Sequence, residues 1–205
     1  MIVIVNYGLG NLGSILNMLR KIGAEAMISS APREIGDAQK IILPGVGAFD
    51  NGMKNLEERG LVPLLTEMVL FRRTPVLGIC LGMQLLGESS EEGTLPGLGW
   101  IEARALHFRF PEADRTLKIP HMGWNTVEAK KESPLFSGVD AESRFYFVHS
   151  YYVDCRCPED VLTTTWHGLE FTSSLQRGNI FGVQFHPEKS HKFGLKLLKN
   201  FVEVA

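Results

Sequence analysis

The chain has 205 residues, 44% of them hydrophobic, and its 21 Lys and Arg residues against 23 Asp and Glu residues give a formal net charge of −2. A chain of this length buries roughly 70% of its unfolded surface, so it can form an apolar core without disulfides or metals, and residues 1–205 are most simply one domain. It carries neither a basic excess nor a long run of like charges, which argues against nucleic acid or an anionic membrane as a partner.

Cysteine usage and the start of the chain indicate the cellular compartment. The chain has 3 cysteines, an odd number, and no cleavable leader precedes the first expected strand. That strand, Ile2–Val5, is far too short to span a bilayer. We therefore expect a protein of the reducing cytoplasm.

The first half of the chain alternates expected strands and helices. Ile2–Val5 is an apolar strand, and apolar residues at helical spacing after it predict a helix that ends at Gly23. Ala24–Ser29 and Lys40–Leu43 are expected strands, and Asn51–Phe71 is expected to be mostly helical. Strands separated by helices usually form a parallel sheet covered on both faces, so we expect an α/β fold with an open, mostly parallel sheet flanked by helices.

The second half is richer in strands and turns. Residues that alternate or are β-branched and aromatic predict additional, antiparallel strands at Gly99–Phe108, Trp124–Ala129, Arg144–Val148 and Val161–Trp166. A hairpin is expected to turn at Arg177–Asn179, and Phe193–Val204 is expected to close the chain as an amphipathic helix.

The segment from Pro75 to Leu86 places one cysteine between a short apolar strand and a helix. Cys80 lies between Gly78 and Gly82, and this spacing lets the chain turn tightly enough to expose the sulfur at the sheet edge, as the equivalent serine turn does in hydrolases. The free N–H groups and the positive dipole end of the first helical turn favour a thiolate. Cys80 is therefore the candidate nucleophile, although a small buried cysteine is also a common structural residue.

A nucleophilic cysteine needs a base and a group that orients the base, and Gly182–Glu188 contains both. His186 and Glu188 project to the same side of an extended chain, so Glu188 can hold one ring nitrogen across the rigid Pro187. The other nitrogen then faces Cys80, which gives a nucleophile, a base and an orienting acid. Taken alone, this segment is equally compatible with a solvated turn that has no catalytic role.

A third motif, Ile41–Phe49, ends an expected strand in a glycine-rich loop. Gly45 and Gly47 free the backbone to turn N–H groups inward, so the amides of Val46 and Leu81 can stabilise an oxyanion on an attacked carbonyl. Alone, the loop is an ordinary strand-to-helix turn. Together with the two preceding motifs it favours nucleophilic catalysis.

Two other patterns suggest cofactors, and we reject both. Gly8–Gly13 matches the G-x-G-x-x-G fingerprint of dinucleotide binding, but the next expected strand ends at Ser29 and Ser30 instead of an acidic residue for the ribose. Cys155 and Cys157 have neither zinc-binding nor redox spacing. We expect no cofactor and no metal.

In this order, the motifs around Val46, Cys80 and His186 resemble those of the class I, triad-type glutamine amidotransferases over the whole chain. The resemblance implies a flavodoxin-like fold and hydrolysis of L-glutamine to glutamate and ammonia through a thioester on Cys80. Further segments resemble the glutaminase subunits of imidazole glycerol phosphate synthase, namely Asn6–Asn11, Pro120–Asn125, Phe147–Tyr151 and Lys189–Ser190.

The resemblance also assigns substrate contacts. Glu92 matches the carboxylate that receives the α-ammonium group of glutamine, and Gln84 lines the same pocket. Ser150 and Tyr151 correspond to backbone contacts for the α-carboxylate. Composition alone would leave Glu92 on a solvated face.

A partner is implied as well. By this resemblance, ammonia passes to a cyclase subunit of the (β/α)₈-barrel type, which makes imidazole glycerol phosphate and an aminoimidazole carboxamide ribotide in histidine biosynthesis. The residues expected to face that subunit in a heterodimer are Asn11, Met122, Trp124, Asn125 and Lys189. Met122 and Trp124 are expected on an exposed loop, with a core position for Trp124 as the alternative.

Other functions remain open from the sequence alone. The chain could be a glutaminase serving anthranilate, aminodeoxychorismate or guanylate synthesis, a γ-glutamyl cysteine hydrolase, or a binding subunit without catalytic activity. The remaining histidines are isolated in sequence and are expected to lie on the surface or in hydrogen-bonded structural positions; they are His107, His121, His149, His167 and His191.

Overall fold

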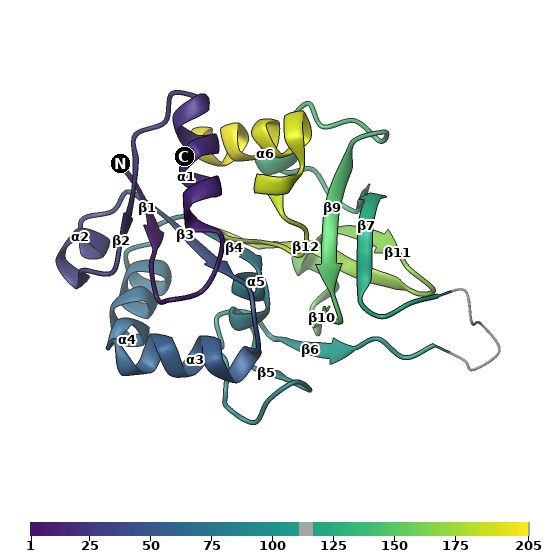
Figure 1. Cartoon of the computed structure of the whole chain (residues 1–205), viewed down its shortest axis with the longest axis horizontal. Coiled ribbons are helices and arrows are strands. Elements are labelled where there is room, and N and C mark those ends of the chain that lie inside the picture. The colour runs from purple at the N-terminus through teal and green to yellow at the C-terminus, as the bar shows by residue number, and fades with distance from the viewer. Residues whose placement is uncertain (111–116, 205) are drawn as a thin grey trace.

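Figure 1 shows the computed structural model of the chain, which describes residues 1–110 and 117–204. The first half of the chain forms a layered helix and sheet unit that the last strand and the last helix join, and the other strands of the second half extend away from it. The strands are β1 (Ile2–Val5), β2 (Ala26–Ser29), β3 (Lys40–Gly45), β4 (Val76–Cys80), β5 (Ser89–Ser90), β6 (Ala103–His107), β7 (His121–Thr126), β8 (Glu128–Ala129), β9 (Arg144–His149), β10 (Tyr151–Cys155), β11 (Val161–Trp166), β12 (Glu170–Arg177) and β13 (Ile180–Val183). The helices are α1 (Leu12–Lys21), α2 (Pro32–Gly36), α3 (Phe49–Glu58), α4 (Leu61–Thr66), α5 (Leu81–Leu85) and α6 (His191–Glu203), with short turns η1 (Glu67–Phe71), η2 (Pro134–Phe136), η3 (Pro158–Asp160) and η4 (Pro187–Lys189).

The parallel part of the main sheet has the strand order β2-β1-β3-β4-β13. In its register Gly45 at the end of β3 lies opposite Cys80 at the end of β4. The carboxyl ends of parallel strands meet at one edge, where ligands of such sheets bind. This register brings the glycine-rich loop and the candidate nucleophile together, and the predicted α/β fold with a mostly parallel sheet is confirmed.

The second half adds antiparallel strands. Beyond β13 the sheet continues antiparallel through β12, β10 and β6, while β7 and β9 form a separate two-stranded sheet. The predicted hairpin is confirmed, since Gly178 has a φ of +57° between β12 and β13. Because β13 runs parallel to β4, the chain leaving β13 carries His186 to the same sheet edge as Cys80.

Two apolar clusters lie on opposite faces of the parallel strands. On β1, Ile2 and Ile4 belong to one cluster and Val3 and Val5 to the other, as strand alternation requires. Helices α1 and α6 cover the first face, and α2, α3, α4 and α5 cover the second. None of the helices in residues 1–110 and 117–204 is both long and apolar enough to cross a membrane.

Some elements differ from the sequence predictions. The expected helix over Asn51–Phe71 is interrupted at Gly60, whose left-handed φ of 65° separates α3 from α4. Helix α2 was not expected, because its 5 residues are too few to show a helical period. Met122 and Trp124 were expected on an exposed loop, with a strand only from Trp124 onward, but strand β7 begins at His121 and includes both residues, and its pairing with β9 fixes them.

Candidate active site

Cys80 occupies a strained backbone position where β4 meets α5. Its φ of 54° and ψ of −109° are unusual for a residue with a side chain, and such conformations cost about 1–3 kcal/mol. The neighbouring glycines are required by close packing, since a Cβ on Gly82 would lie 1.8 Å from the Leu43 carbonyl oxygen and one on Gly78 would lie 2.7 Å from the Gly82 oxygen. The predicted tight turn around the cysteine is therefore present, and it presents the sulfur at the sheet edge.

His186 lies between an acid and the thiol. Its Nδ1 is 2.8 Å from Glu188 Oε1, and the two side chains are 2% and 1% exposed. Burial by itself lowers the pKa of His186, but hydrogen bonds and charge interactions with Cys80 and Glu188 outweigh it and raise the pKa to about 10. Glu188 therefore holds the imidazole at Nδ1, and the acid and the thiol together favour its protonated form.

The backbone around the imidazole is also fixed. The His186 amide donates to the Tyr146 carbonyl at 2.9 Å, and Ser190 Oγ donates to the His186 carbonyl at 2.6 Å. The Tyr146 amide in turn donates to Ser190 Oγ at 3.0 Å. Strand β9 and turn η4 thus clamp the base through one fully buried serine.

The loop expected to form the oxyanion hole lies directly beside Cys80. A Cβ on Gly45 would lie 2.6 Å from Tyr7 Oη and 2.8 Å from Leu81 Cβ, so only glycine allows this approach. Val46 follows with its side chain largely exposed, and Gly47 has a φ of +127°. Val46 and Leu81 are thus adjacent across the β3 and β4 ends.

A buried tyrosine supports the same loop. Tyr7 Oη donates to the Pro44 carbonyl at 2.5 Å, immediately before the glycine-rich turn. Burial and the nearby charge of Cys80 both raise the pKa of Tyr7, so the hydroxyl remains a donor. This contact was not predicted, because nothing local in the sequence connects Tyr7 with Pro44.

The predicted substrate residues make hydrogen bonds that link α5, the start of α3 and the chain around β10. Gln84 Nε2 donates to the Tyr151 carbonyl at 3.2 Å, and Glu92 Oε2 accepts from the Phe49 amide at the start of α3 at 2.9 Å. Partial burial and the carboxylates of Glu92 and Glu91 raise the pKa of Tyr151. The Ser150 carbonyl accepts from the Phe108 amide at 3.1 Å.

One residue at the site was missed. Gln184 is fully buried, with Nε2 3.6 Å from Cys80 Sγ and Oε1 accepting from Gln84 Nε2 at 3.2 Å. Its spacing of two residues from His186 was an available signal, because residues two apart project to the same side of an extended chain.

The residues expected to face a partner lie on neighbouring elements. Met122 and Trp124 are 62% and 45% exposed on β7, so the core alternative for Trp124 is wrong. Trp124 stacks on the His191 ring with centroids 5.4 Å apart, and Lys189 Nζ lies 5.6 Å from the centre of the Tyr146 ring.

The remaining two expected partner residues flank this surface. Asn11 immediately precedes α1, which packs against η4. Asn125 Nδ2 lies 3.3 Å from His121 Nε2 and donates to the Trp166 carbonyl at 3.0 Å. These contacts link the Asn125 end of β7 to the buried His121 side chain.

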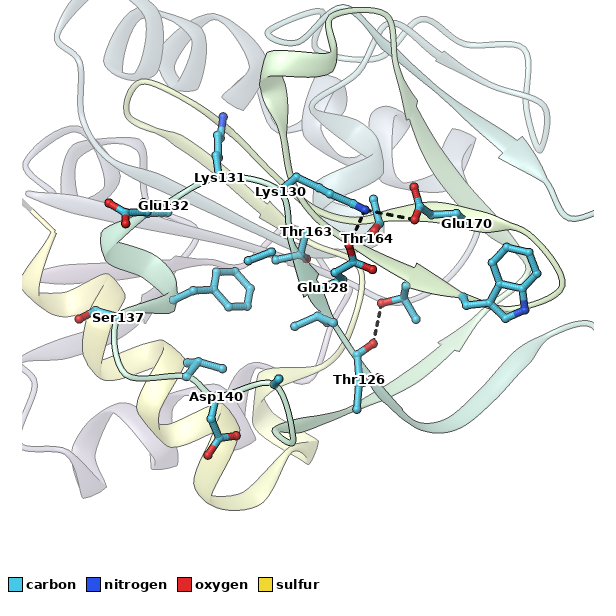
Figure 2. Close-up of a pocket in the computed structure, with 18 of the residues that line it drawn as sticks. Thr126, Glu128, Lys130, Lys131, Glu132, Ser137, Asp140, Thr163, Thr164 and Glu170 are labelled. Carbon is cyan, nitrogen blue, oxygen red and sulfur yellow. Dashed lines mark hydrogen bonds and ion pairs between the residues drawn. The ribbon is translucent and has the colours of Figure 1, made fainter.

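The cavity in Figure 2, of about 1140 Å³, lies elsewhere. It is lined by residues between 126 and 141 and by β11, and by none of the residues assigned to the substrate or the partner. Its Lys130 is paired with Glu128 at 2.9 Å and Glu170 at 3.2 Å, as Figure 2 shows. The size of a cavity alone does not identify a catalytic site, and we place the candidate site at Cys80, where nucleophile, base and acid meet.

Within the two described ranges, no group of three or more His, Cys, Asp or Glu side chains is arranged to hold a metal ion.

Comparisons with known proteins agree with this chemistry. The family model "Glutamine amidotransferase class-I" matches residues 3–205. Relatives named "Imidazole glycerol phosphate synthase subunit HisH 2" from Pseudomonas aeruginosa and Methanococcus maripaludis are each 54% identical, over 100% of both chains. A subunit HisH from Bdellovibrio bacteriovorus is 47% identical over 100% of both chains.

Solved structures share the fold at low identity. A structure titled "Crystal structure of glutamine amidotransferase" has a TM-score of 0.72 at 20% identity and covers 98% of this chain and 97% of its own. PurLQS from Thermotoga maritima has a TM-score of 0.75 at 18% identity with the same coverage. The predicted family and enzyme class are confirmed: the chain belongs to the class I glutamine amidotransferases and, within them, to the HisH subunits of imidazole glycerol phosphate synthase.

Proposed function

We propose that this chain is a single-domain cytoplasmic glutaminase that hydrolyses L-glutamine and passes the ammonia to a cyclase subunit of imidazole glycerol phosphate synthase in histidine biosynthesis. The observation that carries the chemistry is the position of Cys80 on a positive-φ turn, beside an imidazole held by Glu188 at 2.8 Å. In class I amidotransferases this arrangement serves nucleophilic attack on an amide. Cys80, His186 and Glu188 are the proposed catalytic residues.

The first half of the reaction forms a thioester. Cys80 Sγ attacks the side-chain amide carbon, and the carbonyl electrons move to oxygen, where the Val46 and Leu81 amides stabilise the oxyanion. The C–N bond then breaks, and His186 gives its proton to the departing nitrogen. Its pKa, raised to about 10, makes that proton available at neutral pH.

The second half releases glutamate. Neutral His186 takes a proton from water, and the resulting hydroxide attacks the thioester carbon. The same two amides stabilise the second oxyanion, the C–S bond breaks, and the sulfur leaves as a thiolate beside protonated His186. The cycle uses only side chains and water, so it needs no cofactor.

Substrate recognition is assigned to the residues around α5. Glu92 receives the α-ammonium group of glutamine, and the Phe49 amide at 2.9 Å holds its carboxylate in place. The backbone of Ser150 and Tyr151 binds the α-carboxylate. Gln84, which already donates to the Tyr151 carbonyl at 3.2 Å, lines the pocket and holds this backbone segment.

The partner is a (β/α)₈-barrel cyclase that forms a heterodimer with this chain. It uses the ammonia to convert a phosphoribulosyl-formimino aminoimidazole carboxamide ribotide into imidazole glycerol phosphate and aminoimidazole carboxamide ribotide. The exposed apolar pair of Met122 and Trp124 supports a docking role, because exposed aromatic and Met side chains are enriched at interfaces. Asn11 and Lys189 complete the proposed face, together with the end of β7 that carries Asn125, whose own side chain lies on the other side of the strand.

The test is glutamine hydrolysis by the chain alone, with the cyclase subunit, and with the cyclase and its ribotide ligand. We expect low activity alone, a rise with partner and ligand, and none in Cys80→Ala. Full activity without any response to the cyclase would refute the assignment to this synthase but keep the triad, whereas activity in Cys80→Ala would refute the mechanism. Complementation of a histidine auxotroph separates this function from service to another synthase.

A further inference from the structure

We propose that a continuous row of hydrogen bonds, here called the histidine relay, runs from strand β7 at the partner face to Cys80 and makes His121 and His149 positioning residues for the nucleophile. This inference rests on the proposed function, because it concerns how the cyclase subunit acts on the same site. The relay comprises Asn125, His121, His149, the Tyr151 carbonyl, Gln84 and Gln184.

The half of the relay nearer the surface is built from β7 and β9. Asn125 Nδ2 lies 3.3 Å from His121 Nε2, His121 Nδ1 lies 3.0 Å from His149 Nε2, and His149 Nδ1 lies 2.7 Å from the Tyr151 carbonyl oxygen. His121 and His149 are direct register partners across the two strands and are only 5% and 6% exposed. The contact is therefore fixed by strand pairing and shielded from water.

The half nearer the active site continues from the same carbonyl. Gln84 Nε2 donates to the Tyr151 oxygen at 3.2 Å and to Gln184 Oε1 at 3.2 Å. Gln184 Nε2 then lies 3.6 Å from Cys80 Sγ, where it can donate to the sulfur. The Gln84 amide thereby connects the histidine pair to the only side-chain amide that contacts the thiol among the described residues.

The direction of every bond follows from the acceptor at Tyr151. A carbonyl can only accept, so His149 carries its proton on Nδ1 and accepts at Nε2. His121 must then carry its proton on Nδ1 and accept from the Asn125 amide at Nε2. Both rings are neutral in this arrangement, consistent with burial, which lowers the pKa of His149 to about 3 and, with the charge of His167, that of His121 to about 4.

The side chains of β7 alternate between an outer and an inner face of the strand. Met122 and Trp124 point outward and are exposed, while His121 and Asn125 point to the other side. The β7 and β9 pair forms a separate two-stranded sheet, which the bond between the His186 amide and the Tyr146 carbonyl joins directly to the catalytic segment. A displacement of β7 would change the relay distances, and hydrogen-bond networks of this kind carry coupling between sites.

His167 provides a matched comparison. Its ring stacks on that of His121 with centroids 4.2 Å apart, but its Nε2 bonds to the Lys118 carbonyl at 2.9 Å, outside the relay. The same His→Phe change can therefore be made in the relay and beside it. The substitution His121→Phe keeps an aromatic ring beside Phe147 and Phe171, and His167→Phe keeps one beside Phe108 and Phe110.

The experiment compares wild type, His121→Phe, His121→Gln and His167→Phe. For each we measure the affinity for the cyclase subunit, kcat and KM for glutamine with and without cyclase and ribotide, and the rate at which iodoacetamide alkylates Cys80. In His121→Phe we expect cyclase affinity and KM to stay within about twofold, while the stimulation of kcat and of alkylation falls by at least about fivefold, the lower end of typical couplings between sites. Partial recovery is expected in His121→Gln, and His167→Phe should behave as wild type.

Full stimulation in His121→Phe, or an equal loss in His167→Phe, would overturn the relay. If wild type itself shows no stimulation, the proposed function has failed, which is a separate result. A measurement on wild type guards against variants that do not fold: ¹⁵N spectra of the ring nitrogens should show both His121 and His149 as neutral Nδ1–H tautomers at pH 7, with resonances that shift when the cyclase binds. Other tautomers, or unchanged resonances, would equally overturn the proposal.

Discussion

The substitution Gly82→Ala tests whether the catalytic turn depends on contact between α5 and β3. An alanine Cβ at this position would lie 1.8 Å from the Leu43 carbonyl oxygen and 2.9 Å from its carbon, whereas real Cβ contacts are essentially never closer than 3.0 Å. The helix and strand must therefore separate by roughly 1.2 Å. Overpacking of this kind costs about 1–3 kcal/mol of unfolding free energy, and more where the backbone cannot yield.

The same displacement should also affect catalysis. Gly82 is one residue after Leu81 and two after Cys80, so the displacement moves the Leu81 amide, a proposed oxyanion donor, relative to the nucleophile. A misplacement of about 1 Å can cost on the order of 100-fold in rate, and we expect a loss of that size in kcat. The assays are urea unfolding by circular dichroism and glutamine hydrolysis with the cyclase subunit and ribotide present.

A matched control is available on α1. A Cβ on Gly13 would meet nothing within 4 Å, so Gly13→Ala should leave kcat unchanged and stabilise the helix by about 0.5–1 kcal/mol. If Gly82→Ala unfolds cooperatively and keeps wild-type kcat, the close approach of α5 to β3 is not needed for catalysis. The requirement for glycine beside Cys80 would then be refuted.

Three further predictions concern residues that hold the site or the fold. Glu188→Gln removes a carboxylate that, together with Cys80, raises the pKa of His186 to about 10, so the alkaline limit of kcat/KM should move to lower pH. In wild type the stabilisation from this raised pKa is complete below about pH 6.5 and is lost as pH rises to about 10. An unchanged pH profile in the variant would contradict the assignment. Tyr7→Phe removes the 2.5 Å bond to the Pro44 carbonyl and should cost about 1–3 kcal/mol in urea unfolding together with a fall in kcat, whereas lower stability at wild-type kcat would show that Tyr7 does not position the oxyanion loop. Asn200→Leu removes two bonds, at 2.9 and 2.8 Å, from α6 to carbonyls outside the helix, and should cost about 1–3 kcal/mol in the same assay without changing kcat; a fall in kcat would mean that α6 also supports the site.

Local patterns predicted the parts of the site that depend on few neighbouring residues. The turn at Cys80 follows from glycines two residues away on each side, and the contact between His186 and Glu188 follows from their spacing, although Pro187–Lys189 forms a 3₁₀ turn and not the extended chain that was predicted. The hairpin at Gly178 follows from turn chemistry. In each case the relevant atoms are within about two residues, so backbone sterics alone decide the outcome.

Contacts between distant segments could not be predicted in this way. Gln184 and Cys80 are 104 residues apart, and the relay histidines His121 and His149, which are isolated in sequence, are 28 apart. Strand β7 was expected in part as a loop because its apolar residues face outward, toward no core of this chain.

The sequence by itself determined the chemistry available to this protein: a cysteine on a tight turn, a histidine with its acid, and a loop of glycines. Only the tertiary structure decided which of these groups meet, because register and burial depend on the packing of complementary faces across the whole sheet. The pairing of Gly45 with Cys80 and the parallel course of β13 beside β4 bring the three motifs to one edge. The same packing desolvates His121 and His149 and aligns them, a result that no local pattern encodes.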